Sequence, residues 1–288
     1  VSDGGVHSHL RHLIALIELA QRHRVPNLFV HAITDGRDSS PTGAANYLPS
    51  VESSLHAAGP GHIASVCGRY YAMDRDKRWE RTQKAYDALA QGKARHATNV
   101  ESLVQNSYKE GVTDEFIEPT VIVNENGQAV GPLRDGDAVI FFNYRADRAR
   151  QLVAALAFDS QRFSDFERGK RSRVNVTTLT EYEATYQLPV AFSPATFTGN
   201  VAEVLAQNQL SNLRLAETEK YAHVTYFFNS GEETPYTGED RILVPSPKVP
   251  TYDLAPDMSA KSITDQFVND INKQQHDVII CNFANADM

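Results

Sequence analysis

The sequence is poor in cysteine and has no long apolar run. Its 288 residues include two cysteines, Cys67 and Cys281, which cannot form the disulfide framework of a secreted scaffold. The longest apolar stretches, such as 13–20 with Glu18 inside it, fall well short of the ~20 residues that span a bilayer. We therefore expect neither a disulfide-rich secreted domain nor a membrane protein or membrane partner. A reducing, cytoplasmic location fits this composition.

A surplus of positive charge is missing as well. The chain has 28 Lys and Arg against 36 Asp and Glu, which gives a formal net charge of −8. The stretch at 69–81 has five basic residues, but it also has three acidic residues. Because nonspecific binding to nucleic acid depends on many Lys and Arg contacts to phosphates, nucleic acid is not an expected partner.

The sequence also lacks the ends of a typical complete chain. It begins at Val1 without an initiator methionine or a signal-like segment, and it stops a few residues after an apolar run at 278–281. We therefore expect both ends to be cut from a longer protein. The length itself corresponds to roughly two domains.

Apolar runs alternate with amphipathic stretches along the first two thirds of the chain. This pattern predicts an α/β fold in which a mostly parallel sheet is flanked by helices. The predicted strands are 28–33, 62–67, 138–142 and 174–179, with a turn signal at 125–127 for an edge hairpin. The predicted helices are 10–20, 44–58, 76–91, 100–109 and 146–157.

The periodicity fails at 188–194, where two prolines predict an inter-domain connector. We place the domain boundary after residue 190. Beyond it, helices at 201–207 and 262–272 and strands at 213–216, 241–245 and 278–281 again predict an α/β arrangement. This second piece is small for a doubly wound sheet, as expected if it is only part of a domain.

Polar clusters that pair arginine with carboxylate follow three of the predicted strands. They occupy 34–38, 68–76 and 143–148. Ligands of open parallel sheets bind beyond the carboxyl ends of strands, and the arginine fork binds phosphate or carboxylate through paired hydrogen bonds. A single Arg-Asp pair is most often a solvated loop pair. Its recurrence after three strands predicts a site for a small polyanion.

Other residues offer alternative or additional chemistry. His7, His9 and His12 suggest a metal, but no nearby carboxylate or thiol completes a zinc site, and the segment suits an anion or a proton shuttle instead. In the second piece, Lys220 follows a strand and suits a phosphoryl group, and Asp287 follows the last strand, where carboxylates commonly hold divalent metals.

Five ordered motifs together resemble the cofactor-independent phosphoglycerate mutase family over the whole chain. They are SDGGVHSH at 2–9, HAITDGRD at 31–38, GRYYAMDR at 68–75, FNYRADR at 142–148 and AETEKYAHV at 216–224. The resemblance implies a glycolytic isomerase that interconverts 3-phosphoglycerate and 2-phosphoglycerate, working as a monomer. It also implies a transferase domain, here 1–190, inserted into an alkaline-phosphatase-like domain, here represented in part by 191–288.

The resemblance also implies roles for individual residues. The substrate-binding positions are His7, Arg37, Asp38, Arg69, Arg75, Arg145, Arg148 and Lys220. Asp38 is the candidate for proton exchange with the glycerate hydroxyls, and Lys220 lies beside the phosphoserine of the intermediate. Asp287 matches one ligand of the two manganese ions.

The family's serine nucleophile and a first metal aspartate are expected before Val1, and further metal ligands after Met288. We therefore expect this stretch to bind substrate rather than to catalyse. Two alternatives stay open: a noncatalytic anion-binding fragment, and a related metal-dependent phosphomutase or phosphatase of the same superfamily.

Overall fold

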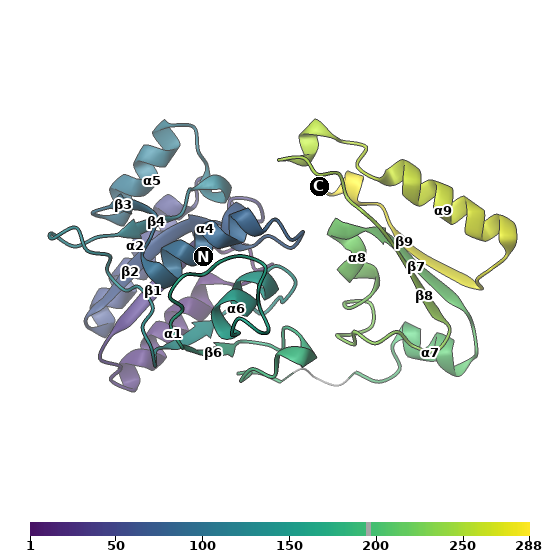
Figure 1. The fold of residues 1–288 in the computed structure, drawn as a ribbon, viewed down its shortest axis with the longest axis horizontal. Coiled ribbons are helices and arrows are strands. Elements are labelled where there is room, and N and C mark those ends of the chain that lie inside the picture. Colours follow the sequence, from purple (N-terminus) through teal and green to yellow (C-terminus); the bar gives the residue numbers. More distant parts are fainter. Residues whose placement is uncertain (194–196) are drawn as a thin grey trace. The chain divides into compact units, whose positions relative to one another are not determined.

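The computed structural model describes residues 1–193 and 197–288, which form two compact units, Val1–Ser193 and Pro194–Met288 (Figure 1). The predicted connector at 188–194 is described up to Ser193, and its Pro194 lies outside the described residues. Its first part is tied to unit 1, because the backbone N–H of Ala191 donates to Thr178 O at 2.9 Å.

Unit 1 contains two sheets. The larger has the order β1-β2-β4-β3, with β1 (Leu28–Thr34), β2 (Gly61–Gly68), β4 (Thr120–Ile122) and β3 (Arg95–Ala97). The β1–β2 and β3–β4 pairs are parallel, and β2 pairs with β4 antiparallel. The smaller sheet joins β5 (Ala138–Phe141) and β6 (Asn175–Thr178) in parallel. The predicted α/β class with mostly parallel sheets is confirmed.

Helices flank these sheets (Figure 1). They are α1 (Leu10–Arg22), α2 (Ala44–Ala58), α3 (Arg69–Ala72), α4 (Trp79–Gln91), α5 (Val100–Lys109) and α6 (Arg150–Ala157), with 3-10 turns η1 (Asp114–Phe116) and η2 (Ala184–Tyr186). The core has two main parts. Leu152 and Val153 of α6 pack with Tyr86 of α4, and Ile17 of α1 packs with Leu48 of α2.

Several details of unit 1 differ from the sequence predictions, including the start of α4 at Trp79 rather than at 76. Helix α6 begins at Arg150 rather than 146, because 147–149 form a turn in which Ala149 N donates to Ala146 O at 2.9 Å. The turn at 125–127 closes only a single bridge, Val123 to Ala129, and β4 lies between β2 and β3 rather than at an edge. The short elements β3 and α3 were not predicted, since three or four residues carry too little periodicity.

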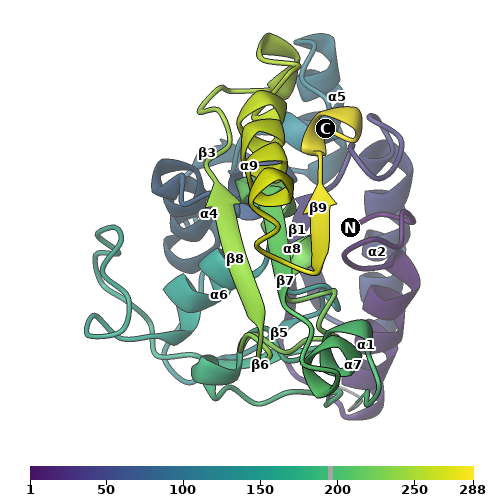
Figure 2. The ribbon, with the colours of Figure 1, turned by 90° about the vertical axis from the view of Figure 1, so that its right-hand side faces the viewer.

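Unit 2 contains a three-stranded parallel sheet in the order β8-β7-β9. The strands are β8 (Glu239–Val244), β7 (Asn212–Glu217) and β9 (Val278–Asn282). The helices are α7 (Val201–Gln207), α8 (Thr218–Val224) and α9 (Ala260–Lys273), with 3-10 turns η3 (Tyr252–Leu254) and η4 (Ala284–Ala286). Helix α9 lies across one face of the sheet (Figure 2), where its buried Ile263 packs against Leu213 and Leu215. Helix α8 was not predicted.

His31 gives unit 1 a specific response to pH. Its Nδ1 on β1 lies 2.8 Å from the Ser65 Oγ of β2, and burial lowers the pKa of His31 from 6.5 to about 4. The ring is therefore neutral in both folded and unfolded chains above about pH 6.5. Between about pH 6.5 and pH 4, His31 binds a proton in the unfolded chain but not in the folded chain. We therefore expect His31 alone to lower the free energy of unfolding by up to ~1.4 kcal/mol for each pH unit below 6.5 in this range.

Urea unfolding between pH 7.5 and 4 measures this effect. The stability of a His31→Gln variant is expected to fall less steeply with decreasing pH than that of the wild type. A His62→Gln variant serves as the control, because His62 is exposed on the neighbouring strand β2. Parallel curves for His31→Gln and the wild type across the window would contradict the assignment.

Candidate functional site

The loops that follow β1 and β2 meet around the buried side chain of Arg69. Arg69 opens α3 directly after β2, and its side chain is 5% exposed. Its Nη1 donates to Asp35 Oδ1 at 2.8 Å and to Asp38 Oδ2 at 2.5 Å. One guanidinium thus joins two carboxylates of the loop after β1.

A second group of charges forms around Asp147, in the turn before α6. Arg75 Nη1 donates to Asp147 Oδ2 at 2.7 Å. Arg145 donates from Nε to Oδ1 at 2.9 Å and from Nη2 to Oδ2 at 3.0 Å. Arg148 Nη1 reaches the backbone oxygen of Met73 at 3.3 Å, which ties it to the loop that carries Arg75.

His7 lies between the two groups. Its Nε2 is 3.3 Å from Arg69 Nη2, and its Nδ1 is 3.8 Å from Asp147 Oδ1. Burial, followed by the positive charge of Arg69, lowers the pKa of His7 from 6.5 to about 3. The ring is therefore neutral at pH 7. Because a guanidinium can only donate, Nε2 is the acceptor and the proton resides on Nδ1.

The structure thus connects five of the predicted residues of unit 1 through polar contacts: His7, Asp38, Arg69, Arg75 and Arg145. Arg37 is placed differently. Its side chain is 36% exposed, and its Nη1 lies 3.7 Å from Glu115 Oε1 of η1. It belongs to the same loop as Asp38 and faces η1 through this pair.

We call His7, Asp38, Arg69, Arg75 and Arg145 the arginine cluster. The sequence predicted that aspartates next to the arginines could orient them, but it did not single out Asp35 and Asp147, which organise this cluster. Burial alone would raise the pKa of Asp35, but the backbone N–H of Asp38 and the Arg69 guanidinium lower it to about 2. Asp147 is bound by two arginines, as described above. Both aspartates stand inside the motifs quoted above. The neighbouring sequence, however, does not distinguish a buried carboxylate that binds arginines from a carboxylate exposed to solvent. Glu115 gave no signal, because it comes from a separate segment between α5 and β4.

Turn η1 also shapes the loops through their glycines. Gly36 has a φ of +71°, and a Cβ added to it would lie 2.7 Å from the backbone N of Glu115. A Cβ on Gly68 would meet the Glu115 backbone oxygen as well. Glycine at both positions lets η1 approach the loops that carry Asp38 and Arg69.

Substitution of Gly36 tests this close approach. Gly111 is a matched control, because its φ is +78° and nothing lies within 4 Å of its added Cβ. Both alanine variants strain a left-handed backbone, but only Gly36→Ala also collides with another backbone segment. We expect Gly36→Ala to lower the free energy of unfolding by ~1 to 3 kcal/mol more than Gly111→Ala. Equal losses in urea unfolding would refute the contact.

In unit 2, Lys220 and Asp287 lie beyond the carboxyl ends of neighbouring strands. Lys220 belongs to α8, which follows β7, and Asp287 follows β9 and η4. The Lys220 Nζ donates to an Asp287 carboxylate oxygen. Lys220 is buried, whereas Asp287 is exposed. The structure thus brings together the two residues of unit 2 for which the sequence predicted chemistry.

The structure gives little support to a metal within the described residues. Across 1–193 and 197–288, no group of three or more His, Cys, Asp and Glu side chains is arranged to hold an ion. His9 instead caps α1, because its Nδ1 accepts from Arg11 N at 3.1 Å. The three-histidine metal alternative is therefore not supported.

Among the residues that the structure describes, no helix is both long and apolar enough to cross a membrane.

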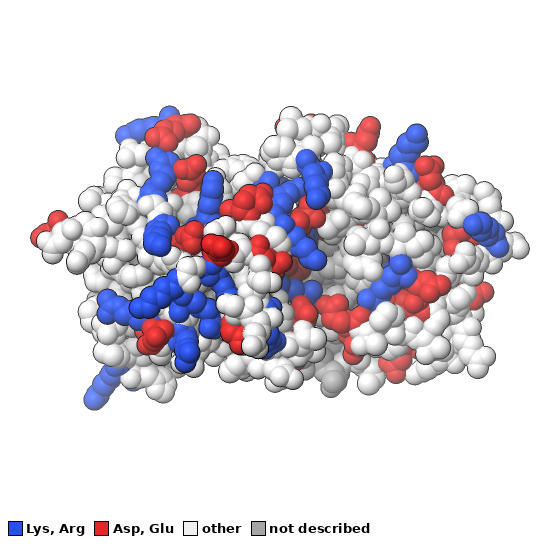
Figure 3. Space-filling model, in the orientation of Figure 1, with Lys and Arg blue, Asp and Glu red and all other residues white. Residues whose placement is uncertain are grey.

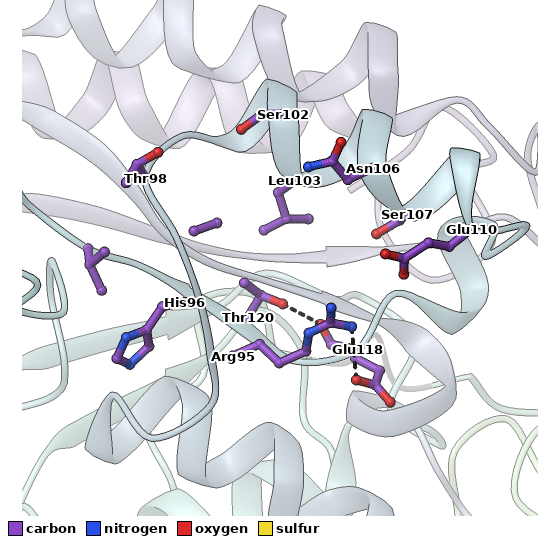
Figure 4. Close-up of a pocket in the computed structure, with 12 residues that line it drawn as sticks. Arg95, His96, Thr98, Ser102, Leu103, Asn106, Ser107, Glu110, Glu118 and Thr120 are labelled. Carbon is purple, nitrogen blue, oxygen red and sulfur yellow. Dashed lines mark hydrogen bonds and ion pairs between the residues drawn. The ribbon is translucent and has the colours of Figure 1, made fainter.

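A separate pocket of about 340 Å³ lies beside β3 and α5 (Figure 4). Polar side chains such as Thr98, Asn106 and Glu110 line it, and Arg95 in its wall pairs with Glu118 at 3.2 Å. None of the predicted site residues lines this pocket.

On the molecular face drawn in Figure 3, Lys and Arg are interspersed with Asp and Glu over both units.

Comparisons with known proteins agree on one family. A family model described as BPG-independent PGAM N-terminus matches residues 1–184. The chain is 52% identical to the 2,3-bisphosphoglycerate-independent phosphoglycerate mutase of Desulforudis audaxviator, over 100% of this chain and 56% of that protein. It is 48% identical to 2,3-bisphosphoglycerate-independent phosphoglycerate mutase 1 of Methanosarcina barkeri, again over 100% of this chain and 56% of that protein.

A solved structure shows the same similarity. It is a crystal structure of Leishmania mexicana phosphoglycerate mutase at low cobalt concentration, with a TM-score of 0.93 and 29% sequence identity. The match covers 99% of this chain and 54% of that one. The chain thus spans about half the length of the relatives it matches.

Proposed function

Because the chain belongs to the cofactor-independent phosphoglycerate mutase family, we propose that it holds the glycerate part of phosphoglycerate while 3-phosphoglycerate and 2-phosphoglycerate are interconverted. The observation that carries this proposal is the meeting of three loops at His7, where Arg69, Arg75 and Arg145 gather around buried carboxylates. These loops lie far apart in the sequence and have no other evident reason to share one charged cluster.

The reaction explains why such a cluster is needed. When a phosphoryl group leaves one hydroxyl and returns to another, the glycerate must stay bound and reorient meanwhile. Groups other than the nucleophile must therefore hold it. Arginine forks suit its carboxylate, and the neutral His7 offers hydrogen bonds without adding charge.

Asp38 is the residue we propose for proton exchange with the glycerate hydroxyls. Its side chain is 24% exposed, so a ligand can reach it, and Arg69 holds it from one side only, at Oδ2. A carboxylate that is both positioned and accessible can accept a hydroxyl proton and return it. Asp147, which is 4% exposed, does not meet the second condition.

In unit 2, we propose that Lys220 neutralises the phosphoryl group and that Asp287 is one ligand of a metal ion, manganese in the family that the sequence resembles. The Leishmania mexicana relative was crystallised with cobalt. The described residues do not complete a metal site, since Asp287 lies beside Lys220 and outside any group of three ligand side chains. A bound divalent ion would stabilise charge on the transferred phosphoryl group.

Calorimetric titration of the 288-residue chain tests the binding role. We expect 3-phosphoglycerate to bind at least ~10-fold more tightly than glycerol 3-phosphate, which lacks the carboxylate that an arginine fork would hold. Inorganic phosphate serves as the control for nonspecific anion binding. If all three ligands bound with the same affinity, the cluster would be a general anion site, and the proposed glycerate role would be wrong.

A further inference from the structure

The turn before α6 places Asp147 at the centre of the arginine cluster. The turn is rigid: Ala146 and Ala149 at its ends are buried, and Tyr182 Oη donates to the backbone oxygen of Asn143 at 2.7 Å. The Asp147 side chain is 4% exposed and accepts three hydrogen bonds from two guanidinium groups. Its position is therefore set by the backbone and the core rather than by its charged partners.

Arg145 is held in one orientation. Its Nε and Nη2 donate to the two different oxygens of Asp147, at 2.9 and 3.0 Å. Two parallel hydrogen bonds fix the plane of a guanidinium, whereas a single bond leaves it free to rotate. Since Asp147 lies only two residues away on the same turn, this orientation is built into the local structure.

Arg75 reaches the same carboxylate from the loop after α3. Its Nη1 donates to Oδ2, the oxygen that also accepts from Arg145 Nη2. Two guanidinium groups repel each other at such short range unless an anion lies between them. The Asp147 carboxylate therefore determines how closely Arg75 and Arg145 approach, and with that the spacing of the donors a ligand would meet.

The Asp147 carboxylate stays ionised near neutral pH. Burial alone would raise its pKa, but Arg145 and Arg75 hold that pKa well below its usual range. A group that stays ionised cannot carry a proton through a reaction cycle near neutral pH. Its contribution is therefore structural support for other groups rather than proton transfer, which separates it from Asp38.

We propose that Asp147 is a positioning residue that sets the spacing and orientation of Arg75 and Arg145 for binding the glycerate anion. This inference rests on the proposed function of the cluster. A symmetric small anion tolerates a change of spacing, but 3-phosphoglycerate, with anionic groups at both ends of a short carbon chain, does not. The affinity for phosphoglycerate should therefore depend on Asp147 more than the affinity for phosphate does.

The Asp147→Asn variant tests this dependence, because asparagine keeps the size of the side chain and removes its charge. We expect it to bind 3-phosphoglycerate ~10- to 100-fold more weakly than the wild type, by analogy with groups that orient ligand-binding side chains. The loss for inorganic phosphate should stay within about threefold. Asp87→Asn is the matched control, since Asp87 is partly buried on α4 outside the cluster.

Nuclear magnetic resonance of the arginine side chains provides a readout that a general loss of stability would not mimic. In the ligand-free wild type, the Arg145 Nε–H signal should exchange with water much more slowly than that of Arg11, which is exposed on α1. In folded Asp147→Asn, this protection should be lost. If the variant fails to fold, the wild-type measurement still decides, because exchange as fast as that of Arg11 overturns the proposal.

The outcomes separate the two proposals. If the wild type does not bind 3-phosphoglycerate, the proposed function fails whatever Asp147 does. If the wild type binds it and a folded Asp147→Asn variant binds equally well, the positioning role fails while the proposed function stands. Equal losses for 3-phosphoglycerate and phosphate would also overturn the positioning role, because they would indicate a general loss of anion binding that does not depend on the spacing of the two arginines.

Discussion

Replacing Arg69 by methionine is expected to lower the free energy of unfolding of unit 1 by ~3 to 5 kcal/mol, the range for breaking a buried ion pair from one side. Methionine retains much of the side-chain volume but removes the cation that holds Asp35 and Asp38 at 2.8 and 2.5 Å. The side chain of Asp35 is 14% exposed, so its charge would be left in a largely dry environment. Desolvation of that carboxylate, rather than loss of packing, is the source of the effect.

Urea unfolding followed by tryptophan fluorescence measures this change in unit 1 alone. The sequence has a single tryptophan, Trp79, which opens α4 and packs edge to face on Phe163 at 5.6 Å between ring centroids. The matched control is Arg95→Met. The Arg95–Glu118 pair is 61% and 51% exposed, so breaking it should change stability by no more than ~1 kcal/mol. Similar losses for both variants would mean that the Arg69 network is not effectively buried.

The helices were the most predictable part of the fold, because their signals are local. Helices α2, α5 and α7 have the bounds that their sequences predict. Helix α6 starts four residues late, although its apolar pattern does not change there. The turn before it is fixed by the core and by the hydrogen bond that Tyr182 Oη donates to the backbone oxygen of Asn143. Such tertiary contacts leave no periodic trace.

Strand pairing was less predictable, because it joins distant segments. The alternation of strands and helices predicts a mostly parallel sheet, and β1 and β2 do pair in parallel. It cannot show that β4 enters between β2 and β3. The strand β3 has three residues, of which two are exposed, so its apolar signal is too weak to indicate a strand that displaces β4 from the edge.

The candidate site was partly predictable for a similar reason. The carboxyl ends of strands in parallel sheets indicate where ligand-binding side chains gather, and Arg69 and Arg145 were found that way. His7 was found from the motif before the first helix instead. Whether each carboxylate exchanges protons or orients an arginine depends on exposure and distance, which sequence does not contain. Asp38 and Asp147 both stand beside arginines in the sequence, yet one is accessible and the other is buried.

The Arg145→Ala variant is expected to lose most of its affinity for 3-phosphoglycerate. Removal of one partner from a desolvated charge contact typically costs about 2 to 5 kcal/mol, which corresponds to a loss of affinity of ~30-fold or more. Arg11→Ala is the control, since Arg11 is an exposed arginine on α1. Calorimetric titration of the 288-residue chain with 3-phosphoglycerate measures both variants.

The effect on folding should be smaller for Arg145→Ala than for Arg69→Met, which makes the binding result interpretable. Without Arg145, Asp147 still accepts from Arg75 Nη1 at 2.7 Å, so the buried carboxylate keeps a cationic partner. Arg145 is also 23% exposed, so less of its contact area lies in the dry interior than for Arg69. A variant that unfolds at nearly the wild-type urea concentration but no longer binds 3-phosphoglycerate would therefore place Arg145 in contact with the ligand. Unchanged affinity in the same folded variant would show that Arg145 serves only to neutralise Asp147.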